Sequence, residues 1–175
     1  MNTKFCFMVV LCLAVNVNIF AQRLSTEKIN QFNSQGKREG LWRDTFSYCI
    51  YEQYYRNGIK NGFSKEYNRE TRNLYTFGEY KDGQMCGTWF FFEITGHLMF
   101  ILKDFGVNTT PIKGRKAIPE YKCYFIGYYP NGNIENEGEL LWYADDVPES
   151  DTSVEYGKWK YYDENGNLIE TKVFK

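Results

Sequence analysis

The stretch GQMCGTWFFFEITGHL, from Gly83 to Leu98, decides the fold because its parts recur along most of the chain. It opens with two glycines four residues apart and a tryptophan two residues further on, and it closes with aromatic residues and a turn that ends in glycine. GKREGLW, from Gly36 to Trp42, repeats the first half, and GKWKYYDENGNL, from Gly157 to Leu168, carries the tryptophan and the second half. The chain is therefore a repeat protein, whose units bury their aromatic residues only against their neighbours.

The copies keep a regular period. The second glycine of the first half-motif falls at Gly40, Gly62 and Gly87, so the copies are 22 and 25 residues apart, a spacing typical of solenoid repeats. Gly138 is interpreted as a degenerate copy of that glycine between Gly87 and Gly157. The positions that define the repeat are Gly40, Trp42, Gly62, Gly83, Gly87, Trp89, Gly96, Gly132, Gly157, Trp159 and Gly166.

Asparagine-glycine and aspartate-glycine pairs supply the turns. Such pairs favour tight hairpins, whose central residues need positive φ, and they occur at 57–58, 82–83, 131–132 and 165–166. Aromatic and β-branched runs of strand length lie between them, for example at 74–80, 88–92, 121–129 and 158–162. Each unit is thus predicted to be a β-hairpin. Because a lone hairpin is marginal in water, successive hairpins must extend one sheet and give an all-β fold.

Strand alternation assigns the faces of that sheet. Trp89 and Phe91 are expected on one face, with Phe90 and Phe92 on the other. At 159–162 the same rule places Trp159 with Tyr161 and Lys160 with Tyr162. We therefore expect a packed aromatic row on one face and a mixed surface on the other.

The N-terminal region is predicted to hold an export signal and a short helix. Residues 1–21 have a positive start at Lys4, an apolar run from Phe5 to Ala14 and a small residue before a cut at Gln22. A membrane anchor is the competing interpretation, but two asparagines interrupt the apolar run, which is shorter than the roughly 20 residues a spanning helix needs. We expect an exported protein, periplasmic or secreted, with no transmembrane segment in its mature chain, and a helix from Ser25 to Phe32.

Charge and cysteine content narrow the class of partner. The formal net charge of −1 lacks the basic excess that phosphate binding needs, so no nucleic-acid partner is expected. The expected mature chain keeps Cys49, Cys86 and Cys123, which allow either one disulfide with a cysteine left over or three buried thiols, and we favour the thiols.

The segment YTFGEYKDGQMCGTW, from Tyr75 to Trp89, resembles the MORN repeat. The core residues of that repeat fall here at Tyr75, Gly78, Glu79, Tyr80, Gly83 and Gly87. Tyrosine pairs before Asn-Gly and a tryptophan after the second glycine look like the bacterial variant found in MORN-like antitoxin-type proteins. The resemblance covers most of 36–175. It implies an elongated antiparallel meander, an open single sheet that acts as a non-catalytic scaffold for protein or lipid contact.

Two insertions break the period of this domain, which is expected to span 22–175. They lie near 105–120 and 145–153 and flank the same hairpin, at 121–143. Insertions in repeat proteins become loops and often carry binding, so they are the candidate binding loops. Their charged residues are predicted to form a salt-linked cap or a charged recognition edge: Lys113, Arg115, Lys116 and Lys122 on one side, and Asp145, Asp146, Glu149, Asp151 and Glu155 on the other.

No group of residues has the pattern of a catalytic or metal site. His97, the only histidine, follows a turn glycine and is interpreted as a turn residue. Together with Cys49, Cys86 and Cys123 it could form a zinc set, but the spacing lacks a zinc knuckle. The acidic insertion could bind calcium, but it lacks the alternating pattern of a calcium loop. We therefore expect no catalytic residue, metal or cofactor.

These observations predict an exported, non-catalytic scaffold. It is expected to bind a protein or cell-envelope partner through its sheet face and inserted loops. The alternative is a carbohydrate-binding module of the cell envelope, in which exposed tryptophan and tyrosine rows stack on sugar rings.

Overall fold

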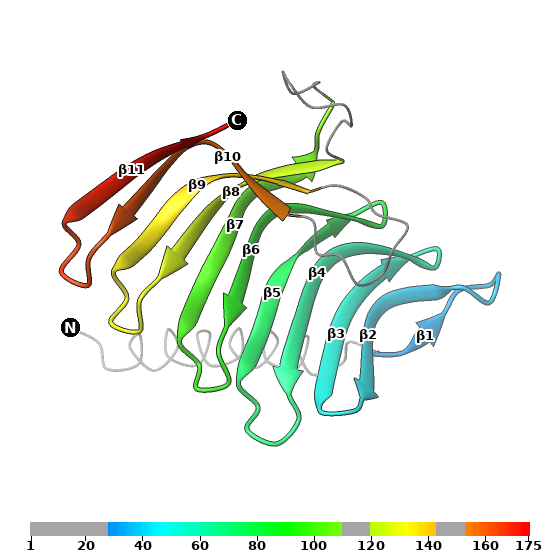
Figure 1. The fold of residues 1–175 in the computed structure, drawn as a ribbon. Coiled ribbons are helices and arrows are strands. Elements are labelled where there is room, and N and C mark those ends of the chain that lie inside the picture. Colours follow the sequence, from blue (N-terminus) through cyan, green and yellow to red (C-terminus); the bar gives the residue numbers. More distant parts are fainter. Residues whose placement is uncertain (1–27, 110–119, 143–152) are drawn as a thin grey trace, which may run out of the picture.

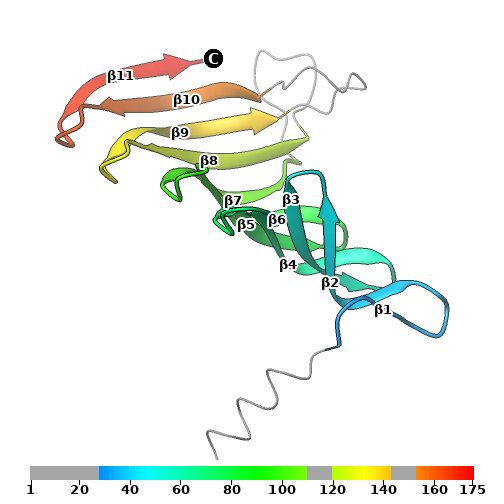
Figure 2. The same ribbon diagram turned by 90° about the horizontal axis from the view of Figure 1, so that it is seen from below.

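Eleven strands form one antiparallel sheet whose strand order follows the chain from β1 to β11 (Figure 1). This computed structural model describes residues 28–109, 120–142 and 153–175, and these contain no helix. The strands are β1 (Gln31–Phe32), β2 (Arg38–Phe46), β3 (Cys49–Arg56), β4 (Ile59–Asn68), β5 (Leu74–Lys81), β6 (Gln84–Phe92), β7 (Leu98–Val107), β8 (Tyr121–Tyr128), β9 (Ile134–Trp142), β10 (Ser153–Tyr162) and β11 (Leu168–Phe174). The sheet is twisted, and β1 and β11 lie at its two opposite ends (Figures 1 and 2). The predicted all-β meander of hairpins is confirmed.

The helix predicted from Ser25 to Phe32 is wrong where the structure describes it. Gln31 and Phe32 form strand β1, which pairs with β2. The Phe32 ring packs edge-on against Trp42 with 4.9 Å between centroids. Pairing with β2 satisfies backbone groups and covers this tryptophan, and a helix here would give up both. Residues 25–27 lie outside the described residues.

The hairpin turns are of two kinds. At Asn57-Gly58 and Asp82-Gly83 both residues have positive φ, as the sequence predicts. At Asn131-Gly132 and Asn165-Gly166 only the glycine is left-handed, so the prediction is wrong for the asparagines. These turns have more residues between their strands than the first two turns have. The turn at Asn131-Gly132 is closed by a hydrogen bond of 2.8 Å from the Tyr129 N–H to the Asn133 carbonyl.

The second glycine of the repeat is a bulge residue inside a strand. Gly40, Gly62, Gly87 and Gly157 have φ between 67° and 115° within β2, β4, β6 and β10. The pairing register shifts beside the last three. A bulge of this kind bends the strand and re-aims the side chain that follows it. The tryptophan of the repeat stands two residues further on, at Trp42, Trp89 and Trp159.

A different glycine makes room for each of two tryptophans. A Cβ atom added to Gly78 on β5 would lie 2.1 Å from the Trp89 ring, and one added to Gly138 on β9 would lie 2.4 Å from the Trp159 ring. Gly138 does not have positive φ. The interpretation of Gly138 as a degenerate copy of the bulge glycine is therefore wrong, because it takes the role of Gly78.

The two faces of the sheet follow the predicted alternation. Trp42, Trp89 and Trp159 lie on one face, here called the tryptophan face, which carries the buried core of Trp89, Leu102, Phe105, Cys123, Leu140 and Trp159. Phe63, Phe77 and Phe90 stack in a row on the other, the phenylalanine face, with ring centroids 5.7 and 6.0 Å apart.

Candidate functional site

A groove with mainly apolar walls crosses the tryptophan face from β4 to β9. Its volume is about 450 Å³. We call it the aromatic groove, and its lining residues are Glu66, Thr76, Met85, Trp89, Phe91, Leu102, Phe105, Tyr121 and Trp142. A pocket of this size and composition is typical of a binding site.

The pairing register of β4, β5 and β6 positions the residues along one side of the groove. Glu66, Thr76 and Phe91 stand directly opposite one another on β4, β5 and β6. The row continues to Phe100 on β7, whose ring stacks on Phe91 at 4.5 Å. The groove wall therefore passes from a carboxylate, through a hydroxyl, to stacked aromatic rings.

A bulge in β7 positions the residues along the other side of the groove. Asp104 has φ of 54°, and the register with β8 shifts between Lys103 and Gly106. Beyond this bulge the Phe105 ring stacks on Tyr121 at 5.4 Å and meets Trp142 at 6.5 Å. The bulge thus brings three rings from β7, β8 and β9 together at one end of the groove.

The opposite end of the groove is polar. The hydrogen bond to Glu66 and burial raise the pKa of the Cys49 thiol. Burial and the negative charge of Glu66 raise the pKa of Tyr51 to about 12. Both groups therefore stay protonated at neutral pH, and a protonated thiol is a poor nucleophile. This end can accept a hydrogen bond or a positive charge from a ligand through the carboxylate of Glu66.

The tryptophans of the repeat are not available for stacking on a ligand ring. Trp42, Trp89 and Trp159 are only 7%, 3% and 3% exposed. Trp142, which lies outside the repeat motif, is half-buried and lines the groove. The exposed tryptophan rows of the carbohydrate alternative are therefore absent from the described part of the chain.

Both inserted loops leave the sheet next to the groove. Tyr121 stands opposite both Val107 and Trp142, and Trp142 stands opposite Ser153. These four residues bound the two insertions, so the insertions begin and end side by side on β7 to β10. The predicted binding residues Lys113, Arg115, Lys116, Asp145, Asp146 and Asp151 lie outside the described residues.

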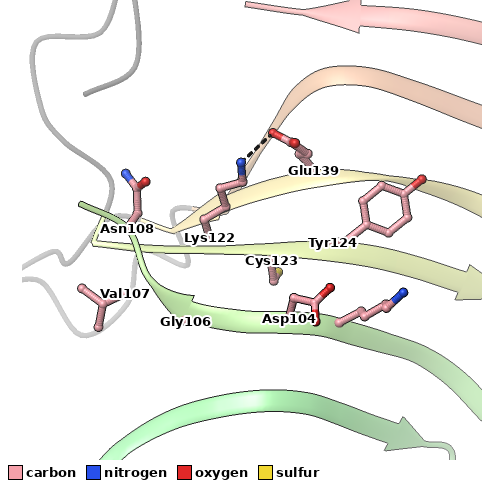
Figure 3. Close-up of a pocket in the computed structure, with 9 residues that line it drawn as sticks. Asp104, Gly106, Val107, Asn108, Lys122, Cys123, Tyr124 and Glu139 are labelled. Carbon is pink, nitrogen blue, oxygen red and sulfur yellow. Dashed lines mark ion pairs between the residues drawn. The ribbon is translucent and has the colours of Figure 1, made fainter. Parts of the chain in front are cut away.

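Lys122, the described member of the predicted basic patch, lies on the phenylalanine face. Its Nζ lies 3.3 Å from the Glu139 carboxylate, and both residues line a second pocket, of about 490 Å³ (Figure 3). Lys103, Asp104 and Tyr124 also line this pocket. Since the cations and carboxylates there lie close together, this pocket has no single sign of charge.

A hydrogen-bonded carboxylate lies beside this pocket on the same face. Glu137 accepts hydrogen bonds from Lys160 Nζ at 2.8 Å and from the Tyr162 hydroxyl at 2.7 Å. These contacts confirm that Lys160 and Tyr162 share a face. Partial burial raises the pKa of Glu137, but the hydrogen bonds from Lys160 and Tyr162 outweigh it, so the pKa lies below its ordinary value.

Replacing Glu137 by glutamine should reduce the acid sensitivity of the fold. A lowered pKa means that ionised Glu137 stabilises the folded state above its ordinary pKa of 4.5 and loses this effect as the pH falls through the folded-state value. We expect E137Q to cost about 1 kcal/mol at pH 7 and less below pH 4, from urea unfolding at each pH. Glu135→Gln, an exposed change on the same strand, is the control. An unchanged pH dependence in E137Q would contradict this role.

His97 and the cysteines do not come together. His97 closes the turn at 93–97 and its ring Nδ1 lies 3.4 Å from the Thr95 hydroxyl. Cys49, Cys86 and Cys123 are all free thiols, and burial raises the pKa of Cys123 to about 11. Within residues 28–109, 120–142 and 153–175, no group of three or more histidine, cysteine or acidic side chains could hold a metal ion.

Comparison with known proteins adds no relative. No protein-family model matches the chain, and no curated protein matches it. The MORN resemblance therefore stays a prediction. The part of the chain that the structure describes holds no helix long and apolar enough to cross a membrane.

Proposed function

We propose that this protein is an exported, non-catalytic scaffold of the MORN-like type, which binds a protein or cell-envelope partner. The aromatic groove and the two insertions, which begin and end side by side on β7 to β10, form the binding surface. The observation that supports this proposal is the aromatic groove itself, which is largely apolar, has a volume of about 450 Å³ and lies on an open sheet face.

The lining of the groove suits a side chain from a partner protein. Phe91, Phe105 and Tyr121 offer ring surface for an apolar or aromatic anchor, and such anchors dominate the binding energy of protein interfaces. Glu66 at the polar end suits a lysine, an arginine or a hydrogen-bond donor beside that anchor. A sugar would find few polar partners along this wall, which disfavours the carbohydrate alternative.

Blocking the groove should abolish partner binding. Thr76→Arg places a long charged side chain between Glu66 and Phe91, so we expect binding to weaken at least about tenfold. The tagged protein would be used to capture partners from the envelope fraction of the producing cell, and the retained proteins would be identified and quantified by mass spectrometry. The affinity of each retained protein for the wild type and the variants would then be measured by titration. Thr45→Arg is the matched control, because Thr45 is exposed and lies on the phenylalanine face.

A glycan array with the same three proteins separates the alternatives. A partner protein that is lost with T76R and kept with T45R supports the scaffold proposal. A sugar with that pattern would support the carbohydrate-binding module instead. If neither kind of ligand responds to T76R, the groove is not the binding surface.

A further inference from the structure

The strand at the C-terminal end of the sheet, β11, has seven residues and an open outer edge within the described part of the chain. Strand β11 pairs only with β10 among the described strands. Six of its seven residues are exposed, including Ile169 at 65% and Val173 at 69%. An edge strand of this kind presents a row of unpaired backbone groups and is a template for pairing with another chain. Native proteins usually protect such an edge with charges, proline or bulges. LIETKVF contains no proline and one charge of each sign, and its one bulge lies at its N-terminal end, before Glu170.

The opposite edge of the sheet is a poor template. Strand β1 has only two residues, Gln31 and Phe32. A head-to-tail contact between β11 of one copy and β1 of the next would therefore pair few residues. A closed pair of β11 strands uses the long edge on both sides.

The sequence of β11 is complementary to itself in one antiparallel register. With Thr171 opposite Thr171, Glu170 stands opposite Lys172 of the second copy, and Lys172 stands opposite the second Glu170. Ile169 then faces Val173, and the regular pairing ends there, because Leu168 lies beyond the bulge at which the register with β10 shifts. Opposite charges and apolar pairs across strands both stabilise a sheet.

Neighbouring registers lack this match. Facing residues of an antiparallel pair lie on the same face of the sheet. Moving the twofold centre by one residue shifts the pairing by two residues, which keeps every side chain on its face. Centring the pairing on Glu170 places two glutamates opposite each other, and centring it on Lys172 does the same with two lysines. Like charges directly opposite are destabilising, so the Thr171-centred register is favoured.

We propose that a second copy of this chain pairs antiparallel with β11, centred on Thr171, and that the protein forms a twofold dimer with a continuous sheet. Glu170 and Lys172 are opposite Tyr161 and Trp159 of β10, so they lie on the tryptophan face. Within one copy they already form an ion pair of 3.2 Å, and both side chains are about half exposed. In the dimer these four charges alternate in sign.

The pairing joins the two tryptophan faces on one side of the sheet. Facing residues of an antiparallel pair lie on the same side, so the two tryptophan faces would form one continuous face of the joined, twisted sheet. The dimer would then present two binding sites to a repetitive or membrane-bound partner and gain avidity. The pairing itself does not depend on the proposed binding function.

Charge reversal tests the proposal by sedimentation velocity from about 1 to 200 µM. The wild-type chain should give a dimer whose population rises with concentration. E170K and K172E should each weaken it at least tenfold, because each creates like-charge pairs at the interface. The double variant E170K/K172E should restore it. An equimolar mixture of the E170K and K172E chains should also dimerise, since one carries two lysines and the other two glutamates.

Cysteine cross-linking tests the register. In a background with Cys49 and Cys86 replaced by serine, Thr171→Cys should give a disulfide-linked dimer under mild oxidation, because facing Cα atoms in a sheet lie about 4.5 to 5.5 Å apart. Ile169→Cys is the control and should cross-link far less, because it faces Val173. A wild-type chain that stays monomeric, single reversals that dimerise normally, higher oligomers in place of a dimer, or equal cross-linking of T171C and I169C would each overturn the proposal.

Discussion

Replacing Trp89 by alanine is expected to lower the free energy of unfolding by about 3 to 5 kcal/mol. Trp89 is 3% exposed, and its ring meets Tyr80 edge-on at 5.1 Å. Its indole N–H donates a hydrogen bond of 3.1 Å to the Cys86 carbonyl in the same strand, next to the Gly87 bulge. A single-layer sheet has no second layer to fill the space that the ring leaves, so the loss should approach the upper end of this range.

Urea unfolding followed by circular dichroism measures this effect. Trp159→Ala should behave alike, because Trp159 is equally buried and stacks on Phe125 at 5.7 Å. Phe63→Ala is the control: its ring is 54% exposed on the phenylalanine face, and its loss should cost less than about 1 kcal/mol. If W89A and W159A are as stable as the wild type, or if F63A costs as much, the core does not lie on the tryptophan face.

Sequence reasoning predicts the hairpins of this sheet well because their determinants are local. Asn57-Gly58 and Asp82-Gly83 adopt the two positive φ angles that few other residue pairs accept. Strand alternation then separates Trp89 from Phe90 without knowledge of any long-range contact. In a meander, each strand pairs with its sequence neighbours, so local turns are enough to determine the strand order.

The roles of individual glycines are harder to predict. Gly87 is required for its positive φ, whereas Gly138 is required for the space that Trp159 fills. Nothing in the residues next to Gly87 or Gly138 distinguishes these two roles. The choice between them depends on which side chain of the next strand lies over the residue, and that depends on the register set by the bulges.

The aromatic groove was not predicted, because a bulge without glycine builds it. Asp104 adopts the left-handed conformation that glycine takes in the other bulges. One signal was present: Lys103 and Asp104 are consecutive polar residues between Leu102 and Phe105, which breaks the strand alternation as a bulge does. Tyr121 and Trp142 gave no signal, since they meet only through the register of β8 and β9.

Replacing Gly78 by alanine is expected to lower the free energy of unfolding by about 3 kcal/mol, the upper range for overpacking. The added Cβ would lie 2.1 Å from the ring of Trp89, which is buried and has no room to move aside. The φ angle of Gly78 is not positive, so alanine itself introduces no backbone strain. Gly106→Ala is the matched control, because Gly106 also lacks positive φ and its added Cβ meets no atom within 4 Å. The control should cost less than about 0.5 kcal/mol.

A double-mutant cycle separates the clash from any other effect of the methyl group. In a Trp89→Ala background the ring is gone, so Gly78→Ala should cost less than about 0.5 kcal/mol, which leaves a coupling energy of about 2 to 3 kcal/mol. The same cycle at Gly138 and Trp159 should give a similar coupling, because the Cβ there would lie 2.4 Å from the ring. Equal costs of Gly78→Ala in both backgrounds would show that this glycine does not make room for the tryptophan. Coupling at both pairs would instead show that glycine and tryptophan on neighbouring strands form the structural unit of this repeat.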